Sequence, residues 1–449
     1  MLKGSKKFLS MMVAVMLVLF TLAGCGSQVA DQGSTGTDIA AATTTEAAAP
    51  ASTPADEPKQ VDLQPVTITF SEQDDPNSVD PTWNEIVKAF MDKYPAVTVK
   101  VEHKETEGQR TDWQNAVLAG AGPEVISCPH DNAGLFAASS TAMELDSFFT
   151  PEFYAQFSPK DIGDYKVNGK IYGIPYKNGN ALTLVYNKKY VQEAPKTMDE
   201  LVVKAKELTK GTEFYGLVFD MVEPFFSVPF LGGYGGKVFD ETGKPTLDTD
   251  AVKNMYQLIY DMKYTWKIIP KEGNTDVANG LFLEGKAAMI INGPWFYNQA
   301  KGKGIDFGIA RIPQLTGGTW PAPYTGAKIF MVNPNIKDDN TKIAVTRFIE
   351  FLCTPENSLK LAKVSTEIPT NLEAQKDTYV TSDPWLKAFA DQMTVGTPMP
   401  YQPEMRVVWD TLRNVQGQVL GGSLKPADAP KAAQDAVLKG IKDQFGKTY

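Results

Sequence analysis

Val66-Thr67-Ile68-Thr69-Phe70 has the pattern of a β-strand, and it is followed by a predicted helix and a second predicted strand, which together indicate the fold class. Asp80-Pro81 supplies an N-cap and a first-turn proline, and Tyr94-Pro95 ends the helix. The apolar residues between them recur at helical spacing, at Trp83, Ile86, Val87, Phe90 and Met91. The next strand shows alternating valines, at Val97, Val99 and Val101. Such a β-α-β unit favours a parallel sheet covered by helices.

Strands and helices go on alternating downstream. Strands are predicted from Gly122-Pro123-Glu124-Val125-Ile126, from Ala181 to Tyr186 and from Ala287 to Ile291. Thr197-Met198-Asp199-Glu200 is a capping box ahead of a helix, and Asp428 to Phe445 is an amphipathic helix. The alternation predicts an α/β fold with ligand chemistry at loop tips. The roughly 385 residues from position 65 onward are too many for one hydrophobic core, so we expect two domains.

The composition is acidic, with a formal net charge of −9. Nucleic-acid phosphates demand Lys and Arg, so we expect no nucleic-acid partner. With two histidines and no CxxC or HExxH motif, a zinc site has little support. We predict no cofactor, no metal and no catalytic residue.

Two further features leave alternatives open. Cys128 and Cys353 can form a disulfide, but their spacing does not require one. Asp75-Pro76-Asn77-Ser78-Val79-Asp80 loosely resembles a calcium loop. It lacks the Gly and the closing Glu, so a solvated turn is the favoured interpretation, and calcium binding stays open.

The N-terminus has the pattern of a secretory signal. Lys3, Lys6 and Lys7 precede an apolar run from Met11 to Phe20, which is shorter than the about 20 residues that span a bilayer. Leu22-Ala23-Gly24-Cys25 then resembles the lipobox of bacterial lipoproteins. The resemblance implies that residues 1–24 are a lipoprotein signal peptide and that Cys25 is lipidated, for example with palmitate. We therefore expect the protein to be anchored to the cell membrane on its extracytoplasmic side, the alternative being a buried structural Cys25.

Residues 25–64 are expected to hold the lipidated cysteine and a flexible tether. From residue 26 to 64 the chain has no aromatic residue and is rich in Ala, Thr, Ser, Pro and Gly. Such a segment cannot bury enough apolar area to offset its ordering entropy.

Four blocks of the remaining sequence resemble the maltose/maltodextrin-binding proteins of ABC importers and, more broadly, extracellular solute-binding proteins for oligosaccharides. The blocks are Ala121-Gly122-Pro123-Glu124-Val125 through His130-Asp131, Tyr186-Asn187-Lys188, Glu223-Pro224-Phe225-Phe226 with Gly232-Gly233-Tyr234, and Ala288-Met289-Ile290-Ile291-Asn292-Gly293-Pro294-Trp295. The resemblance runs from Val66 to Phe445, and the last block is highly specific.

The resemblance implies a two-lobed periplasmic-binding-protein fold of type II, with sugar in the cleft between two α/β lobes. Lobe one would take residues 65–178 and 325–370, and lobe two residues 183–320 and 375–449. The hinge segments would fall near Asn178–Ala181, Pro321–Gly326 and Asn371–Gln375.

A sugar site needs flat apolar platforms for C–H faces and charged or amide groups for hydroxyls. Trp409 and Arg413 are four residues apart, so they share one helix face. The resemblance makes them a platform and a donor, and it makes Trp295 a second platform. The structural alternative for Trp295 is ordinary packing under a loop. The structural alternative for the other pair is that Trp409 is half-buried and Arg413 is solvated.

The resemblance also assigns Asp131 and Glu223 as hydroxyl acceptors and Phe225 as a stacking ring, whereas the bland reading of Asp131 is a loop cap. Tyr297 is expected in the core. The remaining departures from the maltodextrin binders are Cys128 in place of a Trp, Asn132 in place of an Arg and Asn180 in place of a Glu, and Phe225 replaces a Tyr. Glu72, Gln73 or Asp74 can compensate.

The sequence therefore predicts a lipid-anchored, monomeric sugar-binding subunit that is not an enzyme. It would deliver an oligosaccharide to ABC permease subunits that are driven by a separate ATPase. Ligand contacting both lobes would favour the closed cleft. The alternatives are a secreted glycosidase, with Asp131 and Glu223 as acid and nucleophile, and a receptor that feeds a sensor kinase.

Overall fold

The computed structural model describes residues 63–74, 79–163 and 166–449. The predicted signal peptide 1–24, Cys25 and nearly all of the predicted tether lie outside these ranges, as does most of the calcium-loop-like segment. The described residues belong to one compact unit. Within them, no helix is both long enough and apolar enough to cross a membrane.

A six-stranded sheet is built around the predicted β-α-β unit. Its strands, in spatial order, are β13 (Ile368–Pro369), β6 (Ile174–Asn178), β12 (Ala327–Val332), β3 (Val125–Pro129), β1 (Val66–Glu72) and β2 (Val97–His103). β1 pairs in parallel with β2 and β3, as the β-α-β pattern predicts, and β12 runs antiparallel to both β3 and β6.

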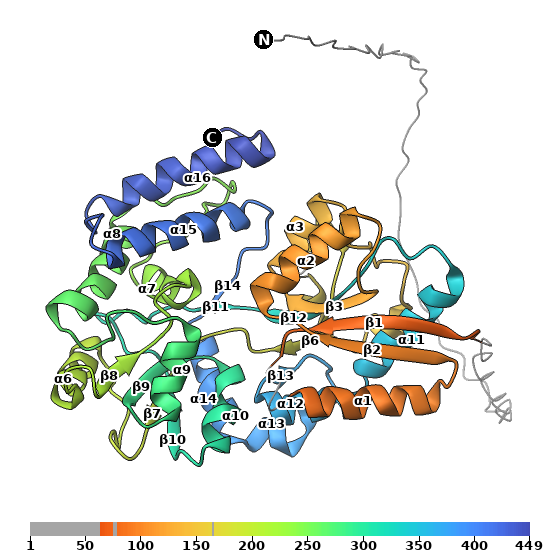
Figure 1. The fold of residues 1–449 in the computed structure, drawn as a ribbon, viewed down its shortest axis with the longest axis horizontal. Coiled ribbons are helices and arrows are strands. Elements are labelled where there is room, and N and C mark those ends of the chain that lie inside the picture. The colour runs from red at the N-terminus through yellow and green to blue at the C-terminus, as the bar shows by residue number, and fades with distance from the viewer. Residues whose placement is uncertain (1–62, 75–78, 164–165) are drawn as a thin grey trace, which may run out of the picture. The chain divides into compact units, whose positions relative to one another are not determined.

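Helices cover both faces of this sheet (Figure 1). The helices of this part of the chain are α1 (Asp80–Lys93), α2 (Thr106–Leu118), α3 (Asn132–Ala138), α4 (Pro151–Tyr154), α5 (Pro159–Gly163), α11 (Asp339–Leu352) and α12 (Pro355–Ser365), and a short hairpin joins β4 (Lys166–Val167) to β5 (Lys170–Ile171). Alternate residues of β12 enter different cores: Phe330 packs with α1 and α11, and Ile329 packs with α2 and α3. This alternation is what buries a sheet on two sides.

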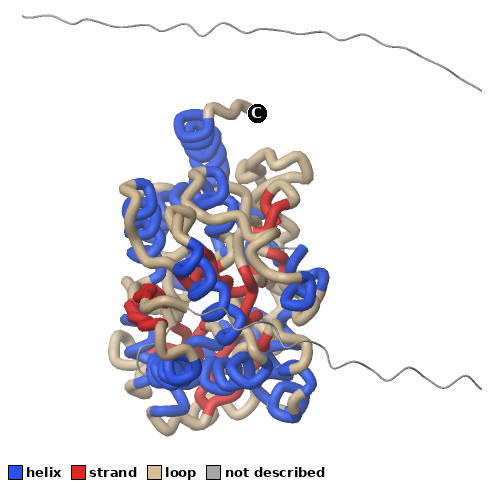
Figure 2. The backbone as a smooth tube through the Cα atoms, turned by 90° about the vertical axis from the view of Figure 1, so that its right-hand side faces the viewer, coloured by secondary structure: helices blue, strands red, loops and turns tan. Residues whose placement is uncertain are grey.

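A second, four-stranded sheet follows the order β10 (Phe307–Ala310), β7 (Thr183–Asn187), β9 (Ala287–Asn292) and β8 (Tyr215–Val218). β9 is parallel to β8 and antiparallel to β7. The helical elements of this part are α6 (Met198–Leu208), η1 (Pro224–Phe226), α7 (Val228–Gly233), α8 (Asp250–Tyr260), η2 (Asp261–Thr265), α9 (Thr275–Leu283), α10 (Pro294–Gly302), α14 (Pro384–Met393), α15 (Met405–Leu420) and α16 (Ala429–Phe445). Figure 2 shows strands in the interior of the molecule with helices around them, and short strand segments near its edge.

The chain passes between the two sheets at three places. β6 ends at Asn178 and β7 begins at Thr183. β11 (Tyr324–Thr325) leads directly into β12, and it pairs in parallel with β14 (Thr397–Pro398). After β13, η3 (Ala374–Lys376) and α13 (Thr378–Ser382) lead to α14, which packs against β10. Because the chain crosses between the sheets at these places, each sheet is built from more than one segment of the sequence. Each sheet is also covered by its own helices.

Local predictions are mostly confirmed, with one correction. The Thr197 hydroxyl accepts from the Glu200 backbone N–H, as a cap should, and α16 buries the predicted stripe of Ala433, Val437 and Ile441. The predicted N-cap Asp80 is wrong, because Val79 occupies that position and Asp80 is the first helical residue. The Asp80 carboxylate lies on the side of His103, with Oδ1 4.0 Å from Nδ1.

The fold also shows whether Cys128 and Cys353 form a disulfide. Cys128 and Cys353 are both free and buried. Cys128 lies in the core with α2 and α3, and Cys353 lies in the core with α1 and α11, on the other side of the sheet. The intervening sheet keeps them apart.

Candidate functional site

The helix α15 organises the candidate site. Trp409 and Arg413 lie one turn apart on it, as their spacing predicts. Trp409 is only 6% exposed and belongs to the core around the four-stranded sheet, so it is more buried than a simple platform would be. Its ring edge meets Tyr324 at a centroid distance of 5.9 Å. Its indole Nε1 donates to Asp131 Oδ2 at 3.4 Å, which links α15 to the loop after β3.

Aromatic rings extend this contact into a row. Phe225, in the 3-10 turn η1, lies 6.3 Å from Trp409 and 6.4 Å from Trp295 between ring centroids. Phe225 and Trp295 are both partly exposed, so part of each ring is available to a ligand. Three rings from sequence positions far apart therefore form one apolar surface.

The Asn-Gly-Pro-Trp block explains how Trp295 reaches this row. β9 ends at Asn292, whose side chain accepts from the Gly293 backbone N–H at 2.8 Å. A Cβ atom on Gly293 would lie 2.2 Å from the Trp295 ring. The glycine therefore lets the ring fold back against the start of α10, where Pro294 occupies the first turn.

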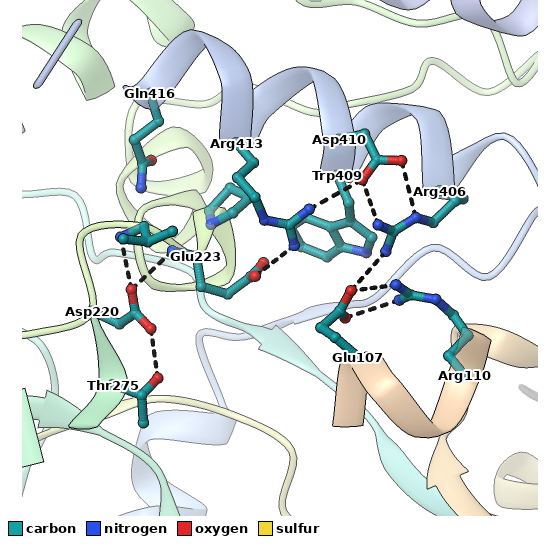
Figure 3. Close-up of polar contacts among 12 residues, drawn as sticks. Glu107, Arg110, Asp220, Glu223, Thr275, Arg406, Trp409, Asp410, Arg413 and Gln416 are labelled. Atoms are coloured by element: carbon teal, nitrogen blue, oxygen red, sulfur yellow. Dashed lines mark hydrogen bonds and ion pairs between the residues drawn. The ribbon is translucent and has the colours of Figure 1, made fainter. Parts of the chain in front are cut away.

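Glu223 and Arg413, the predicted acceptor and donor, face each other. Arg413 Nη2 lies 2.6 Å from Glu223 Oε2 (Figure 3). The turn that carries Glu223 is held by Asp220, whose Oδ1 accepts from the Glu223 backbone N–H and whose Oδ2 accepts from Thr275. Burial raises the pKa of the Glu223 carboxyl, and the bond and charge of Arg413 counter that rise.

Asp131 has an unusual environment for a carboxylate. Its Oδ1 is buried and has no hydrogen-bond partner in the part of the chain that the structure describes. Burial raises the pKa of Asp131 to about 6, against the opposing charge of Arg110 and the bond from Trp409. Beside it is a narrow cavity, lined by Arg110, Asp131, Asn132, Leu135, Gln402, Pro403, Met405, Arg406 and Trp409. A polar ligand group that donates to Oδ1 would complete this environment.

The structure thus brings together all six predicted site residues, Asp131, Glu223, Phe225, Trp295, Trp409 and Arg413, through the contacts described above. Tyr297, which the sequence placed in the core, is fully buried, and its hydroxyl lies 2.6 Å from Thr183 Oγ1.

Four charged residues that the sequence did not single out adjoin the site (Figure 3). They complete a series that we call the bridging charge chain: Arg110, Glu107, Arg406, Asp410, Arg413 and Glu223. Within α2, Arg110 Nη1 donates to Glu107 Oε1 at 2.9 Å, and between α2 and α15, Arg406 Nη1 donates to Glu107 Oε2 at 3.1 Å. Asp410 then joins Arg406 at 3.0 Å and Arg413 at 3.1 Å.

The sequence could predict only the contacts of the bridging charge chain that lie within one helix. The spacings 107/110 and 406/410/413 are those of charged pairs on a helix. The contact from Glu107 to Arg406 crosses 299 residues of sequence, and periodicity carries no information about it. Burial opposes ionisation of Glu107, but the bond and charge of Arg110 and the charge of Arg406 hold its pKa below the ordinary value.

The residues expected to compensate for the departures, Glu72, Gln73 and Asp74, form bonds with other groups of the protein. Asp74 Oδ1 lies 2.9 Å from Lys177 Nζ and 2.6 Å from Lys328 Nζ, and Lys177 also pairs with Glu367 at 2.6 Å. We call these four residues the buried charge network. Gln73 donates to the Ser127 carbonyl, and Glu72 contacts His103.

The departing residues themselves have structural partners. Asn132 donates to the Pro129 carbonyl at 3.0 Å, and Cys128 is buried in the core. Cys128, within β3, and Asn132, at the start of α3, are therefore part of the local fold on either side of the loop that carries Asp131.

The sequence matches the family described as bacterial extracellular solute-binding protein over residues 85–388. It is 27% identical to the maltotriose-binding protein of Pyrococcus abyssi over 383 residues, which cover 83% of this chain and 81% of that protein. It is also 27% identical to a maltooligosaccharide ABC transporter solute-binding lipoprotein of Streptococcus pneumoniae, over 81% of this chain and 86% of that protein.

Solved structures show the same fold. The maltose/maltodextrin-binding domain from Bdellovibrio bacteriovorus bound to maltotriose aligns with a TM-score of 0.81 and 36% identity, covering 84% of this chain and 100% of that chain. The predicted two-lobed binding-protein fold is thereby confirmed.

Proposed function

The chain belongs to the bacterial extracellular solute-binding proteins, and we propose that it is the oligosaccharide-binding subunit of an ABC importer. Its relatives include oligosaccharide-binding proteins of ABC transporters. The proposal assigns the ligand to the residues that meet at α15, and maltotriose is the first ligand to test, because a similar solved structure holds it.

The observation that carries the proposal is the unpaired Oδ1 of Asp131 beside a row of aromatic rings. Leaving a buried acceptor unsatisfied costs roughly 1–3 kcal/mol, so a ligand that donates to it regains that amount. A sugar offers hydroxyl donors at its rim and C–H surfaces for Trp295 and Phe225. Arg413 and Glu223 would exchange their mutual ion pair for sugar hydroxyls on the same side of the site.

We further propose the lobe boundaries predicted from the sequence, 65–178 with 325–370 and 183–320 with 375–449. The passages of the chain between the two sheets support this division. Asp131 follows β3 in one sheet, and Trp409 packs on the other, so a ligand that contacts both gains affinity only when the lobes are close together. Such differential binding would drive closure.

We propose binding without catalysis. The family is described as extracellular solute-binding proteins, and several relatives are named as binding proteins for maltotriose, maltodextrin or maltooligosaccharide. A retaining or inverting glycosidase needs a pair of carboxyl groups set for acid and nucleophile or base. Here Glu223 is held by Arg413 at 2.6 Å and Asp131 by Trp409, an arrangement suited to holding hydroxyls.

The anchoring and the partners are part of the same proposal. A lipidated Cys25 and the tether to residue 64 would hold a monomer at the outer side of the cell membrane, where it would meet the permease subunits. The lipoprotein name of the pneumococcal relative supports this location. Changing Cys25 to Ala should release the protein from the membrane fraction or leave it unprocessed, whereas full membrane retention of the cleaved variant would argue against lipidation.

Calorimetry with maltotriose, maltose, cyclodextrin, xylo-oligosaccharides and lactose tests the proposed function. We expect one saturable site for at least one of these sugars. Chromatography of maltotetraose after incubation with the protein should show no shortened product. Absence of binding across the panel, or release of shorter sugars, would contradict the proposal.

A further inference from the structure

Three side chains at one edge of the six-stranded sheet direct metal-binding atoms toward one point. Glu72 ends β1 and His103 ends β2, and these two residues stand directly opposite each other in the parallel pairing. Asp80 begins α1, which connects the two strands (Figure 1). One ligand atom from each residue lies within 4.8 Å of the others.

The distances are close to those of a coordinated ion. His103 Nδ1 lies 2.9 Å from Glu72 Oε1 and 4.0 Å from Asp80 Oδ1. Zinc binds imidazole nitrogen and carboxylate oxygen at about 2.0–2.2 Å, which places neighbouring ligand atoms roughly 3–4 Å apart. Side-chain movements of about 1 Å would therefore be enough to receive the ion.

The charge at this place supports a cation. The Glu72 side chain is fully buried. Among the described residues, its ion-pair partner is the His103 imidazole, which is charged only when protonated. Lys177 and Lys328 pair instead with Asp74, and Lys104, whose backbone N–H donates to the Glu72 carbonyl, pairs through its side chain with Asp112. Buried carboxylates are normally paired with a cation or coordinate a metal.

A neighbouring backbone group already orients one of the three ligands. The second oxygen of Glu72, Oε2, accepts from the Asp74 backbone N–H at 2.6 Å, which turns Oε1 toward His103. The far ring nitrogen of His103, Nε2, lies 3.9 Å from Oε1 of the exposed Glu105, which is beyond hydrogen-bond distance.

We propose that Glu72, Asp80 and His103 bind one divalent cation of the zinc class, with water completing the coordination. The mixture of one imidazole and two carboxylates suits Zn²⁺ better than Ca²⁺, which takes oxygen ligands. The site does not depend on the proposed sugar function. It departs from the expectation of no metal, because its ligands lie too far apart in sequence to form a zinc motif. A cation there would tie the end of β1, the start of α1 and the end of β2 into one unit, immediately before α2.

Calorimetric titration of the tag-free, chelator-treated protein with Zn²⁺ alone tests the site. We expect one Zn²⁺ per chain. His103→Gln and Asp80→Asn should each weaken binding at least tenfold, which corresponds to about 1.4 kcal/mol. Glu102→Gln is the matched control, because Glu102 is an exposed acid on the same strand with its side chain on the opposite face, and it should leave Zn²⁺ affinity unchanged.

Thermal melts separate loss of the site from loss of the fold. Zn²⁺ should raise the Tm of the unaltered protein and of Glu102→Gln, and it should not raise the Tm of His103→Gln. If His103→Gln fails to fold, Asp80→Asn decides, since Asp80 is partly exposed. The proposal is overturned if the unaltered protein binds no Zn²⁺, or if the folded site variants bind it as tightly as the control.

Discussion

The molecule contains two alternating sets of charges that differ in burial. The buried charge network of Asp74, Lys177, Lys328 and Glu367 lies at the edge of the six-stranded sheet, and the side chains of Lys177 and Asp74 are 2% and 3% exposed. The bridging charge chain connects α2 to α15, and there the side chains of Arg406 and Glu107 are 22% and 52% exposed.

This difference in burial predicts different roles. A buried ion pair has lost its hydration, so removing one partner leaves an uncompensated charge and costs several kcal/mol. An exposed pair contributes little, and salt screens it. The buried charge network is therefore a fixed part of the sheet. The bridging charge chain can open, close or accept ligand hydroxyls at small cost, which suits contacts made between two lobes.

The largest effect is expected when the buried charge network is broken. Lys177→Met leaves Glu367 without its lysine and Asp74 with Lys328 alone, so the free energy of unfolding should fall by about 3–5 kcal/mol. Lys88→Met is the control, because Lys88 pairs with Asp92 on the exposed face of α1 and should change stability by less than about 1 kcal/mol. Denaturant titrations measure both values. Equal stabilities of the two variants would remove the distinction between the two sets of charges.

The next effect concerns the platform beside the bridging charge chain. Trp409→Ala should weaken maltotriose binding at least tenfold, or about 1.4 kcal/mol. Because Trp409 is nearly buried, this change should also lower the Tm. Trp385→Ala is the matched control, since Trp385 stacks on Phe307 at 4.8 Å and, among the described residues, has no ring contact with Phe225, Trp295 or Trp409. It should lower the Tm and leave the affinity of the folded protein intact. Normal affinity in folded Trp409→Ala would move the site away from α15.

A pH effect should come from Asp131, which lines the same cavity as Arg110 and Arg406 of the bridging charge chain and is proposed to bind the ligand. The pKa of Asp131 is raised to about 6 from its ordinary value of 3.8. If the carboxylate form receives the ligand, affinity should fall roughly tenfold between pH 7 and pH 5. The unliganded folded protein holds this proton more tightly than the unfolded chain, so its stability should decrease as pH rises from about 4 to about 6. Asp131→Asn should abolish both trends, and an unchanged pH profile in that variant would assign the titration to another group.

The smallest effect is expected within the bridging charge chain itself. A double-mutant cycle of Glu107→Gln and Arg406→Gln should give a coupling of about 0.2–1 kcal/mol in maltotriose affinity. The coupling should shrink at high salt, because both side chains reach solvent. Lys431→Gln with Asp435→Asn, an exposed pair within α16, should give no coupling in affinity. A larger coupling that salt does not alter would place Glu107 and Arg406 in a buried environment.

The comparison also shows what the sequence can predict. The β-α-β unit, the helix spacing of Trp409 and Arg413 and the strand before Asn-Gly-Pro-Trp depend on short-range periodicity, and the structure contains all of them. The contacts of Asp74 with Lys177 and Lys328 cross 103 and 254 residues. They are set by which strands become neighbours, and no local pattern encodes that order. The misplaced cap at Asp80 has a related cause, because its carboxylate faces a residue of the next strand.

The same limit applied to the site: individual residues could be predicted, but their contacts with one another could not. Resemblance to oligosaccharide binders indicated the six residues that the structure brings together, yet it did not indicate that Glu223 and Arg413 pair with each other. It also did not indicate Glu107, Arg110, Arg406 and Asp410, which complete the charge series around them.

A crystal structure with maltotriose is the most direct test of the central claim, that a sugar completes the environment of Asp131 against the row of aromatic rings. We predict a sugar hydroxyl within about 3 Å of Asp131 Oδ1, with a pyranose face on Trp295 or Phe225 and close to Trp409. Maltotriose bound elsewhere, with Asp131 Oδ1 still unpaired, would contradict the account.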